Sequence, residues 1–195
     1  MSIKRWNAVR IAEAHSPAQF PPDAGPEIAL AGRSNVGKSS LLNALCGQQS
    51  LARTSKTPGR TRALHFFKTD AHLVLVDFPG YGFAKGPGED RKAWRELIEA
   101  YLAARPQLKA VAVLVDSRHE PSPDDKGIFD WLNSIKKNAI CVATKADKLS
   151  GNERTKNLAM FKRELKLNHE PIAFSSVSGM GREELVVRLK ELAKG

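Results

Sequence analysis

Cysteine is scarce in this sequence, and long apolar runs are absent from it. The two cysteines, Cys46 and Cys141, stand too far apart for a metal-binding or redox spacing, so we expect two reduced thiols. The longest apolar runs, residues 110–115 and 139–143, have the length of strands, whereas a membrane-spanning helix needs about 20 apolar residues. No apolar stretch typical of a signal peptide follows the first basic residues. We therefore predict a cytoplasmic protein without a membrane span.

Charge is plentiful, and it is unequal in sign. The 195 residues include 31 lysines and arginines but 21 aspartates and glutamates, which gives a net charge of +10. Such a balance favours a polyanionic partner, although charge alone does not identify it. Apolar residues make up 42% of the chain, close to ordinary globular usage, so disordered and fibrous classes are excluded. The length predicts one domain, preceded by an irregular lead-in over residues 1–26 that is rich in proline from residue 16 onward.

After residue 26, short apolar runs alternate with stretches of helical periodicity. This alternation predicts an α/β fold in three layers, with a mostly parallel sheet and helices on both of its faces. Ser122 before Pro123, and Ser150 three residues before Glu153, mark the starts of two helices. The predicted strands are residues 27–31, 63–69, 72–76, 110–115, 139–143 and 172–174. A tight turn joins the second and third strands, so we predict that this pair is antiparallel at an edge of the sheet.

A glycine-rich segment directly after the first predicted strand fits the phosphate-loop pattern. In this pattern the backbone amides and the terminus of the following helix bind phosphate oxygens, the lysine reaches the β and γ phosphates, and the last hydroxyl binds magnesium. Here Lys38 is the lysine and Ser39 carries the hydroxyl. The alternative, an ordinary glycine-rich turn, is disfavoured by the strand before the segment and the helix after it. The predicted phosphate-binding residues are Gly32, Arg33, Ser34, Asn35, Val36, Gly37, Lys38, Ser39 and Ser40.

A second motif, Asp77-Phe78-Pro79-Gly80, comes at the end of the strand over residues 72–76. An acidic residue that ends a strand beside a phosphate loop holds magnesium through a water molecule, and the Gly80 amide meets a γ phosphate. By itself this pattern is more often a plain turn. Its position after an apolar strand supports the nucleotide site.

A third motif, Thr144-Lys145-Ala146-Asp147, follows the strand over residues 139–143 and concerns the base. A carboxylate in the plane of a purine accepts hydrogen bonds from guanine N1–H and the 2-amino group, whereas adenine offers neither donor there. We therefore predict that Asp147 recognises guanine and that the aliphatic stem of Lys145 lies along the base. Read alone, the segment is also compatible with a charged turn, but its place after two phosphate-site motifs favours guanine recognition.

Residues 54–62, between the first two motifs, have the composition of a mobile loop. A threonine hydroxyl in this loop would complete the magnesium shell only while a γ phosphate is present. On chemistry alone Thr54, Thr57 and Thr61 all qualify, and an exposed basic loop is compatible with the same residues.

Taken in order with Lys56-Thr57-Pro58-Gly59-Arg60-Thr61, these segments resemble the EngB (YihA/YsxC) family of bacterial GTPases, of the Era/TrmE-like group. The resemblance spans nearly the whole chain from about residue 27 and implies a P-loop GTPase fold with a single GTP-binding domain over residues 27–195. It implies roles in assembly of the large ribosomal subunit and in normal cell division and septation. The implied ligands and partners are GTP and GDP, Mg²⁺, ribosomal RNA and large-subunit precursors, and a monomer is expected.

The resemblance also implies roles for individual residues. It makes Thr61 the switch threonine, a catalytic residue together with Lys38 and a direct magnesium ligand together with Ser39, while Asp77 binds through water. Further nucleotide contacts are implied for Gly59, Arg60, Thr61, Arg62 and Ala63 around the phosphate, and for Phe174, Ser175 and Ser176 at the base.

Four positions are informative when the motifs of this chain are compared with those of other GTPases. Thr144 replaces the more usual asparagine, which is expected to weaken one hydrogen bond between loops, and Ser176 stands where alanine is commoner. Tyr81 occupies the place of the water-orienting glutamine of Ras-like enzymes, so no general base is identified and slow intrinsic turnover is expected. Asn35 either ligates a K⁺ ion, as in potassium-activated members of the wider group, or only forms hydrogen bonds within the loop.

Two other classes of function stay open at this point. A P-loop nucleotide kinase would use the same phosphate loop, but Asp147 and the lack of a recognisable acceptor lid oppose it. An RNA-binding module with a vestigial nucleotide site is opposed by the intact Lys38, Ser39 and Asp77. The cationic residues that favour an RNA partner are Arg53, Lys56, Arg60, Arg62, Lys136, Lys137, Lys162, Arg163 and Lys166.

Overall fold

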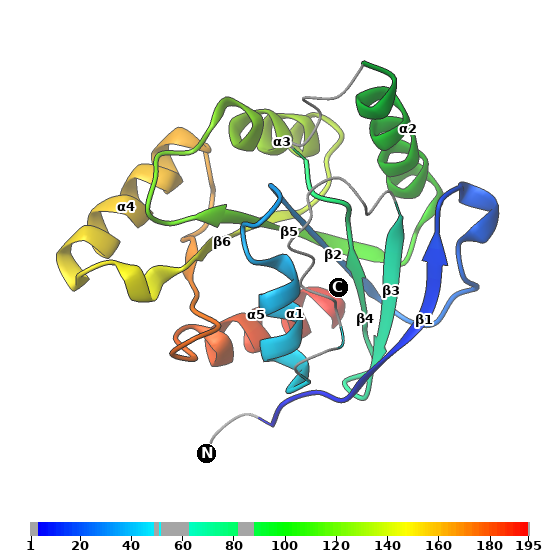
Figure 1. Ribbon diagram of the computed structural model, residues 1–195, viewed down its shortest axis with the longest axis horizontal. Helices are drawn as coiled ribbons and strands as arrows, with labels where there is room; N and C mark the ends of the chain where they lie inside the picture. The colour runs from blue at the N-terminus through cyan, green and yellow to red at the C-terminus, as the bar shows by residue number, and fades with distance from the viewer. Residues whose placement is uncertain (1–3, 49–50, 52–62, 82–87, 195) are drawn as a thin grey trace.

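The computed structural model describes residues 4–48, 51, 63–81 and 88–194, with residues 88–91 described by their backbone alone. Within these ranges the chain forms a seven-stranded sheet with helices on both faces, which confirms the predicted α/β fold (Figure 1). The strands are β1 (Ala8–Ala14), β2 (Glu27–Gly32), β3 (Leu64–Thr69), β4 (Val74–Asp77), β5 (Leu108–Asp116), β6 (Ala139–Thr144) and β7 (Ile172–Ala173). The α-helices are α1 (Lys38–Cys46), α2 (Gly88–Ala104), α3 (Pro123–Ser134), α4 (Gly151–Glu164) and α5 (Arg182–Lys194), with short 3₁₀ turns η1 (Pro17–Gln19) and η2 (Ala146–Lys148).

The strand order β1-β3-β4-β2-β5-β6-β7 makes most of the sheet parallel. β2 pairs in parallel with β4 and β5, and β6 pairs in parallel with β5 and β7. β3 is antiparallel to β4, as the tight turn predicted, and also to β1. The antiparallel strand is therefore one position inside the sheet, and β1 is the edge.

β1 is the element that the sequence did not reveal, because the lead-in over residues 1–26 was expected to be irregular. Its outward side chains include exposed Val9 and Ile11, so apolar and polar residues do not alternate as they do in a half-buried strand. Backbone pairing with β3 holds it, and buried Trp6 anchors its start by donating from its backbone N–H to the Leu45 carbonyl. Residues 16–26 contain no strand, in keeping with their prolines.

Two apolar clusters, one on each face of the sheet, position the helices. Successive side chains of a strand point to opposite faces, so β2 contributes Ile28 to one cluster and Ala29 to the other. The cluster with Ile28 holds the apolar side chains of α1 and α5, and the cluster with Ala29 holds those of α2, α3 and α4 (Figure 1). Parallel β2, β4, β5, β6 and β7 end at the same edge of the sheet, where the predicted motifs meet.

No helix within the described ranges is both long enough and apolar enough to cross a bilayer.

Candidate functional site

The phosphate loop connects β2 to α1, as the sequence predicted. Gly37 has φ +115°, a left-handed conformation that favours glycine, and it precedes the first residue of the helix. No side chain caps α1, so the amides of its first turn are available to an anion. Lys38 is buried and its Nζ donates to the Gly32 carbonyl at 3.2 Å, while burial lowers the pKa of its ammonium and nearby Asp77 opposes that shift. The lysine side chain thus forms a hydrogen bond with the first residue of its own phosphate loop.

Asp77 ends β4 next to this loop. Its Oδ1 is buried and has no hydrogen-bond partner among the described residues, and its burial raises the pKa of the carboxyl group to about 6, against the effect of Lys38. A buried acceptor without a partner is costly unless a ligand supplies a donor or a positive charge. The unpartnered oxygen of Asp77 can therefore accept a hydrogen bond from a cation-bound water or contact a cation directly.

The segment from Phe78 to Tyr81 runs directly along the phosphate loop. The Ser34 amide donates to the Tyr81 carbonyl at 3.2 Å, and a Cβ on Gly80 would lie 2.6 Å from Ser34 Oγ and 2.9 Å from Ser34 N. Only glycine allows the backbone to come this close. Buried Phe78 holds the other end of the segment in the core through an edge contact with Tyr101.

The loop after β6 is tied to the phosphate loop across 108 residues of sequence. The Thr144 hydroxyl lies 2.8 Å from the Val36 carbonyl oxygen and donates to it, with the Val115 carbonyl 3.1 Å away. Lys145 Nζ donates to the Asn35 carbonyl at 3.1 Å. Thr144, expected to weaken one hydrogen bond between the loops, joins them in the structure through its hydroxyl.

The Asp147 carboxylate is fixed by the loop that follows β7. Ser175 Oγ donates to Asp147 Oδ1 at 2.6 Å and accepts from the backbone amides of Val177 and Ser178 at 3.1 Å each. The hydrogen bond from Ser175 is the main cause that lowers the pKa of Asp147. Phe174 brings the two loops together, because its carbonyl accepts from the Ala146 amide at 3.1 Å.

Sequence reasoning missed Asp116, which ends β5 at the same edge of the sheet. Its carboxylate accepts from Lys145 Nζ at 2.8 Å and from both Nε and Nη2 of Arg118, at 2.9 and 2.8 Å. Despite partial burial, these donors together hold the pKa of Asp116 well below its usual range. Asp116 therefore orients Lys145. The signal that identified Asp77, an acidic residue directly after a buried strand, was present here too.

Not every predicted residue can be placed. The switch positions Gly59, Arg60, Thr61 and Arg62 lie outside the described residues, whereas Ala63 is buried just before β3. Ser176 is exposed beside Ser175. The structure therefore brings together the phosphate loop, the segment from Asp77, the segment from Thr144 and the loop after β7.

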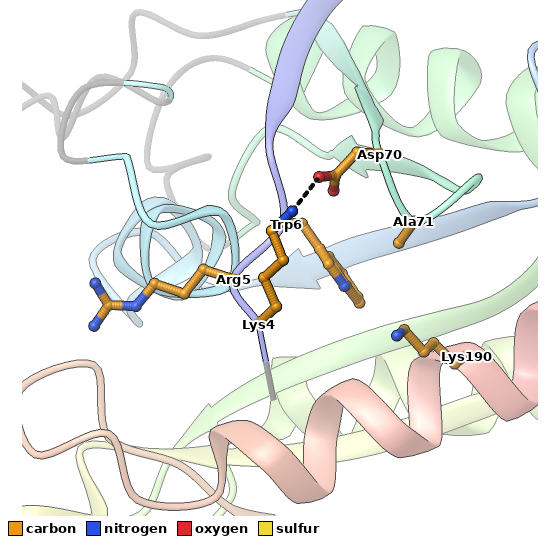
Figure 2. A pocket seen from close by; sticks show the side chains of 6 residues that line it. All are labelled: Lys4, Arg5, Trp6, Asp70, Ala71 and Lys190. Carbon is orange, nitrogen blue, oxygen red and sulfur yellow. Dashed lines mark ion pairs between the residues drawn. The ribbon is translucent and has the colours of Figure 1, made fainter. Parts of the chain in front are cut away.

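A hollow of about 200 Å³ lies elsewhere, between the amino-terminal segment, the turn from β3 to β4 and helix α5. Figure 2 shows the side chains that line it, among them Lys4 and Asp70, which form an ion pair at 3.9 Å. Lys190 approaches from α5. The hollow shares no residue with the loops described above, so it is not part of the candidate site.

Comparisons with known proteins agree with this geometry. The family model described as 50S ribosome-binding GTPase matches residues 27–145. A probable GTP-binding protein EngB of Geobacter metallireducens is 47% identical over 175 residues, which cover 89% of this chain and 86% of that protein. The corresponding protein of Streptococcus equi subsp. zooepidemicus is 47% identical over 184 residues, or 93% of this chain and 92% of its own.

Solved structures show the same fold. The crystal structure of a probable GTP-binding protein EngB superposes with a TM-score of 0.73 at 24% identity, over 86% of this chain and 98% of that one. A variant of Era from Aquifex aeolicus, bound to GDP and AlF₄⁻, superposes with a TM-score of 0.66 at 22% identity, over 88% of this chain and 57% of that one. The family model covers more than half of the chain, and the relatives are nearly half identical over most of both lengths. The chain therefore belongs to the EngB family of GTP-binding proteins, within the 50S ribosome-binding GTPases.

Proposed function

We propose that this protein is a cytoplasmic, magnesium-dependent GTPase switch that acts on precursors of the large ribosomal subunit. One observation carries the proposal. The loop that would bind guanine is held against the loop that would bind phosphate by the Thr144 hydroxyl and the Lys145 ammonium, on Val36 and Asn35. A nucleotide that binds through its base and its phosphates together requires a fixed distance between these two loops.

The phosphates would lie along the amides of the loop and the uncapped first turn of α1. Lys38 would exchange its hydrogen bond with the Gly32 carbonyl for one with the β and γ phosphates. Gly80, which packs against Ser34, would offer its amide to the γ phosphate. The proposed phosphate contacts are Gly32 to Ser40, Gly59 to Ala63, and Asp77 to Gly80.

The residues present also fit a magnesium ion. The unpartnered Oδ1 of Asp77 suits an ion-bound water, and Ser39, in the first turn of α1, has a hydroxyl of the kind that binds the ion directly. Thr61 is the proposed third ligand. Held by these residues, the ion would supply positive charge against the negative charge that develops on the phosphates.

The base would be read by Asp147 from one side and stacked along Lys145 on another. Ser175 donates to Asp147 Oδ1, which holds the carboxylate ionised and oriented toward the N1–H and 2-amino donors of guanine. Asp116 and the Asn35 carbonyl hold Lys145 Nζ near the phosphate loop, and the aliphatic stem of Lys145 would lie along the base. The backbone from Phe174 to Ser176 would contact the base edge.

Hydrolysis of GTP to GDP and phosphate would proceed without a side chain that activates water. Tyr81, at the position of the water-orienting glutamine, is buried, and its hydroxyl donates to Asp125 Oδ1 at 2.9 Å. Its hydroxyl is therefore engaged away from the phosphate loop. Lys38 and Thr61 would stabilise the charge of the transition state, and slow intrinsic turnover follows.

The ribosomal partner is supported by the family and by charge. The matching model is that of 50S ribosome-binding GTPases, and a net charge of +10 favours contact with RNA. We propose that a monomer binds precursor particles in its GTP state and leaves them after hydrolysis, and that division and septation depend on this step.

The base assignment can be tested by titration with GDP, GTP, ATP and xanthosine triphosphate. The wild type should prefer GTP to ATP by roughly 10⁴-fold, because adenine would leave the Asp147 carboxylate unpaired. Asp147→Asn should lose GTP affinity and gain affinity for the xanthine nucleotide, whose 2-oxo group accepts from an amide. Asp130→Asn, the same substitution at an exposed aspartate of α3, is the matched control and should keep the preference. Equal affinity of the wild type for ATP and GTP would contradict the assignment and favour a nucleotide-kinase function.

A further inference from the structure

The peptide unit between Pro79 and Gly80 is fixed by a side chain from helix α2. Trp94 Nε1 donates to the Pro79 carbonyl at 2.8 Å. That carbonyl belongs to the same peptide plane as the Gly80 amide, and the bond is trans, so the two groups point in opposite directions. The indole therefore holds the Gly80 N–H pointing away from α2.

Tyr81, the residue that follows Gly80, is fixed as well. The Tyr81 carbonyl accepts from the Ser34 amide, and the Tyr81 hydroxyl donates to Asp125 at the start of α3. The rings of Tyr81 and Trp94 meet edge to face, with centroids 6.4 Å apart. The residues that flank Gly80 are thus joined to each other and to two helices.

Asp125 is itself held rigidly. It is 4% exposed, and its Oδ2 accepts from the amide and the hydroxyl of Ser122, at 2.9 and 2.6 Å. This is the reciprocal capping box of α3, so the carboxylate is part of the helix start. Its remaining oxygen, Oδ1, is the one that accepts from Tyr81.

We propose that Trp94, Tyr81 and Asp125 are positioning residues that preorient the Gly80 amide for a γ phosphate and thereby set the preference of the site for GTP over GDP. The inference rests on the proposed function, because it takes a γ phosphate as the ligand of Gly80. A preoriented donor costs no reorganisation when the phosphate arrives, whereas a free glycine peptide must be ordered first. GDP lacks the phosphate that this donor meets, so its affinity is independent of the contact.

The test compares Tyr81→Phe and Trp94→Phe with wild type by calorimetric titration of GDP and of the non-hydrolysable analogue GppNHp, both with Mg²⁺. Each variant removes one hydrogen-bond donor and keeps an aromatic ring. Each should bind GppNHp about fivefold to tenfold more weakly and GDP with unchanged affinity. Retained GDP affinity also shows that the variant is folded.

Tyr101→Phe is the matched control, because Tyr101 also donates from a buried hydroxyl to a buried carboxylate, Glu27 Oε2, at 2.7 Å. It lies in the same apolar cluster as Tyr81 and its hydroxyl makes no contact with the phosphate loop. It should lower the melting temperature but leave the ratio of the two affinities unchanged. A ratio that is unchanged in Tyr81→Phe and Trp94→Phe, or equally changed in Tyr101→Phe, would overturn the inference while leaving the proposed function intact. Failure of the wild type to bind either nucleotide would overturn the proposed function and this inference with it.

Discussion

Single side chains explain how the site tolerates replacements in its motifs. Thr144 stands in for an asparagine, and its hydroxyl still reaches the Val36 carbonyl. Ser175, for which a contact at the base is implied, also orients the Asp147 carboxylate through its hydroxyl. In both cases a short hydroxyl suffices because the neighbouring backbones are already held close, by the hydrogen bond between Ala146 and Phe174 among others.

Asn35 carries a prediction at this scale. Its backbone has φ +61°, it is exposed, and its side-chain amide has no hydrogen-bond partner among the described residues. We expect its carbonyl oxygen to ligate a K⁺ ion in the nucleotide-bound protein, and the charge of that ion would assist hydrolysis. We expect GTP turnover to be at least about tenfold faster in potassium chloride than in sodium chloride.

The matching variant is Asn35→Ala, which should turn over GTP equally slowly in both salts. Asn152→Ala, an exposed asparagine in α4, serves as the control and should keep the stimulation. Equal wild-type rates in the two salts would contradict a K⁺ site. Stimulation that persists in Asn35→Ala would show that K⁺ binds at other residues.

Among the elements, β2 and α2 are joined by a buried ion pair at the edge of the sheet opposite the nucleotide site. Glu27, the first residue of β2, is fully buried and accepts from Arg105 and from the Tyr101 hydroxyl. Arg105 follows the end of α2 and also donates to the Pro21 carbonyl at 2.8 Å. The pair thus fixes the end of α2 and the segment before β2 on the central strand.

Arg105→Met should leave Glu27 buried and unpaired. We expect it to lower the free energy of unfolding by about 3–5 kcal/mol, measured by urea denaturation at pH 7. Arg95→Met, which breaks the exposed pair with Glu99 on α2, is the control and should cost less than about 1 kcal/mol. Equal, small losses in the two variants would show that the buried pair does not stabilise the fold.

For the whole molecule, the net charge of +10 does not show which cationic side chains are free to contact RNA, because some of them already form ion pairs. Lys162, Arg163 and Lys166, on or just after α4, form ion pairs with Glu170, Glu164 and Asp130. Lys136 and Lys137, after α3, have no ion-pair partner among the described residues. Arg53, Lys56, Arg60 and Arg62 lie outside those residues. Among the cationic residues predicted to contact RNA, Lys136 and Lys137 are thus the described ones whose charge no carboxylate offsets.

Association with large-subunit precursors should require the GTP state and should weaken steeply with salt. Contact with RNA phosphates releases counterions, so raising salt from about 50 to 200 mM should reduce binding at least about tenfold. Sedimentation with GppNHp or GDP across a salt series measures both effects. Lys136→Glu with Lys137→Glu should weaken binding more than Lys162→Glu with Lys166→Glu, because the latter lysines are already paired. Association that is independent of nucleotide, or insensitive to salt, would contradict the switch model.

The sequence by itself determined the features that are local in the chain. The phosphate loop, the strand ends at Asp77 and Thr144, and the caps at Ser122 and Ser150 each depend on residues within one turn or one strand. Glycine conformation, hydroxyl caps and apolar periodicity act over such short separations, so they can be read without the fold. The alternation of these elements then determined the fold class.

The tertiary structure decided which distant groups meet. β1 joins the sheet through backbone pairing that leaves no apolar pattern, and Asp116, Ser175 and Asp125 gain their roles only from partners brought to them by packing. The bond between Tyr81 and Asp125 spans 44 residues, and the one between Thr144 and Val36 spans 108. Side-chain contacts at such separations depend on how helices pack on the sheet, which no local pattern encodes.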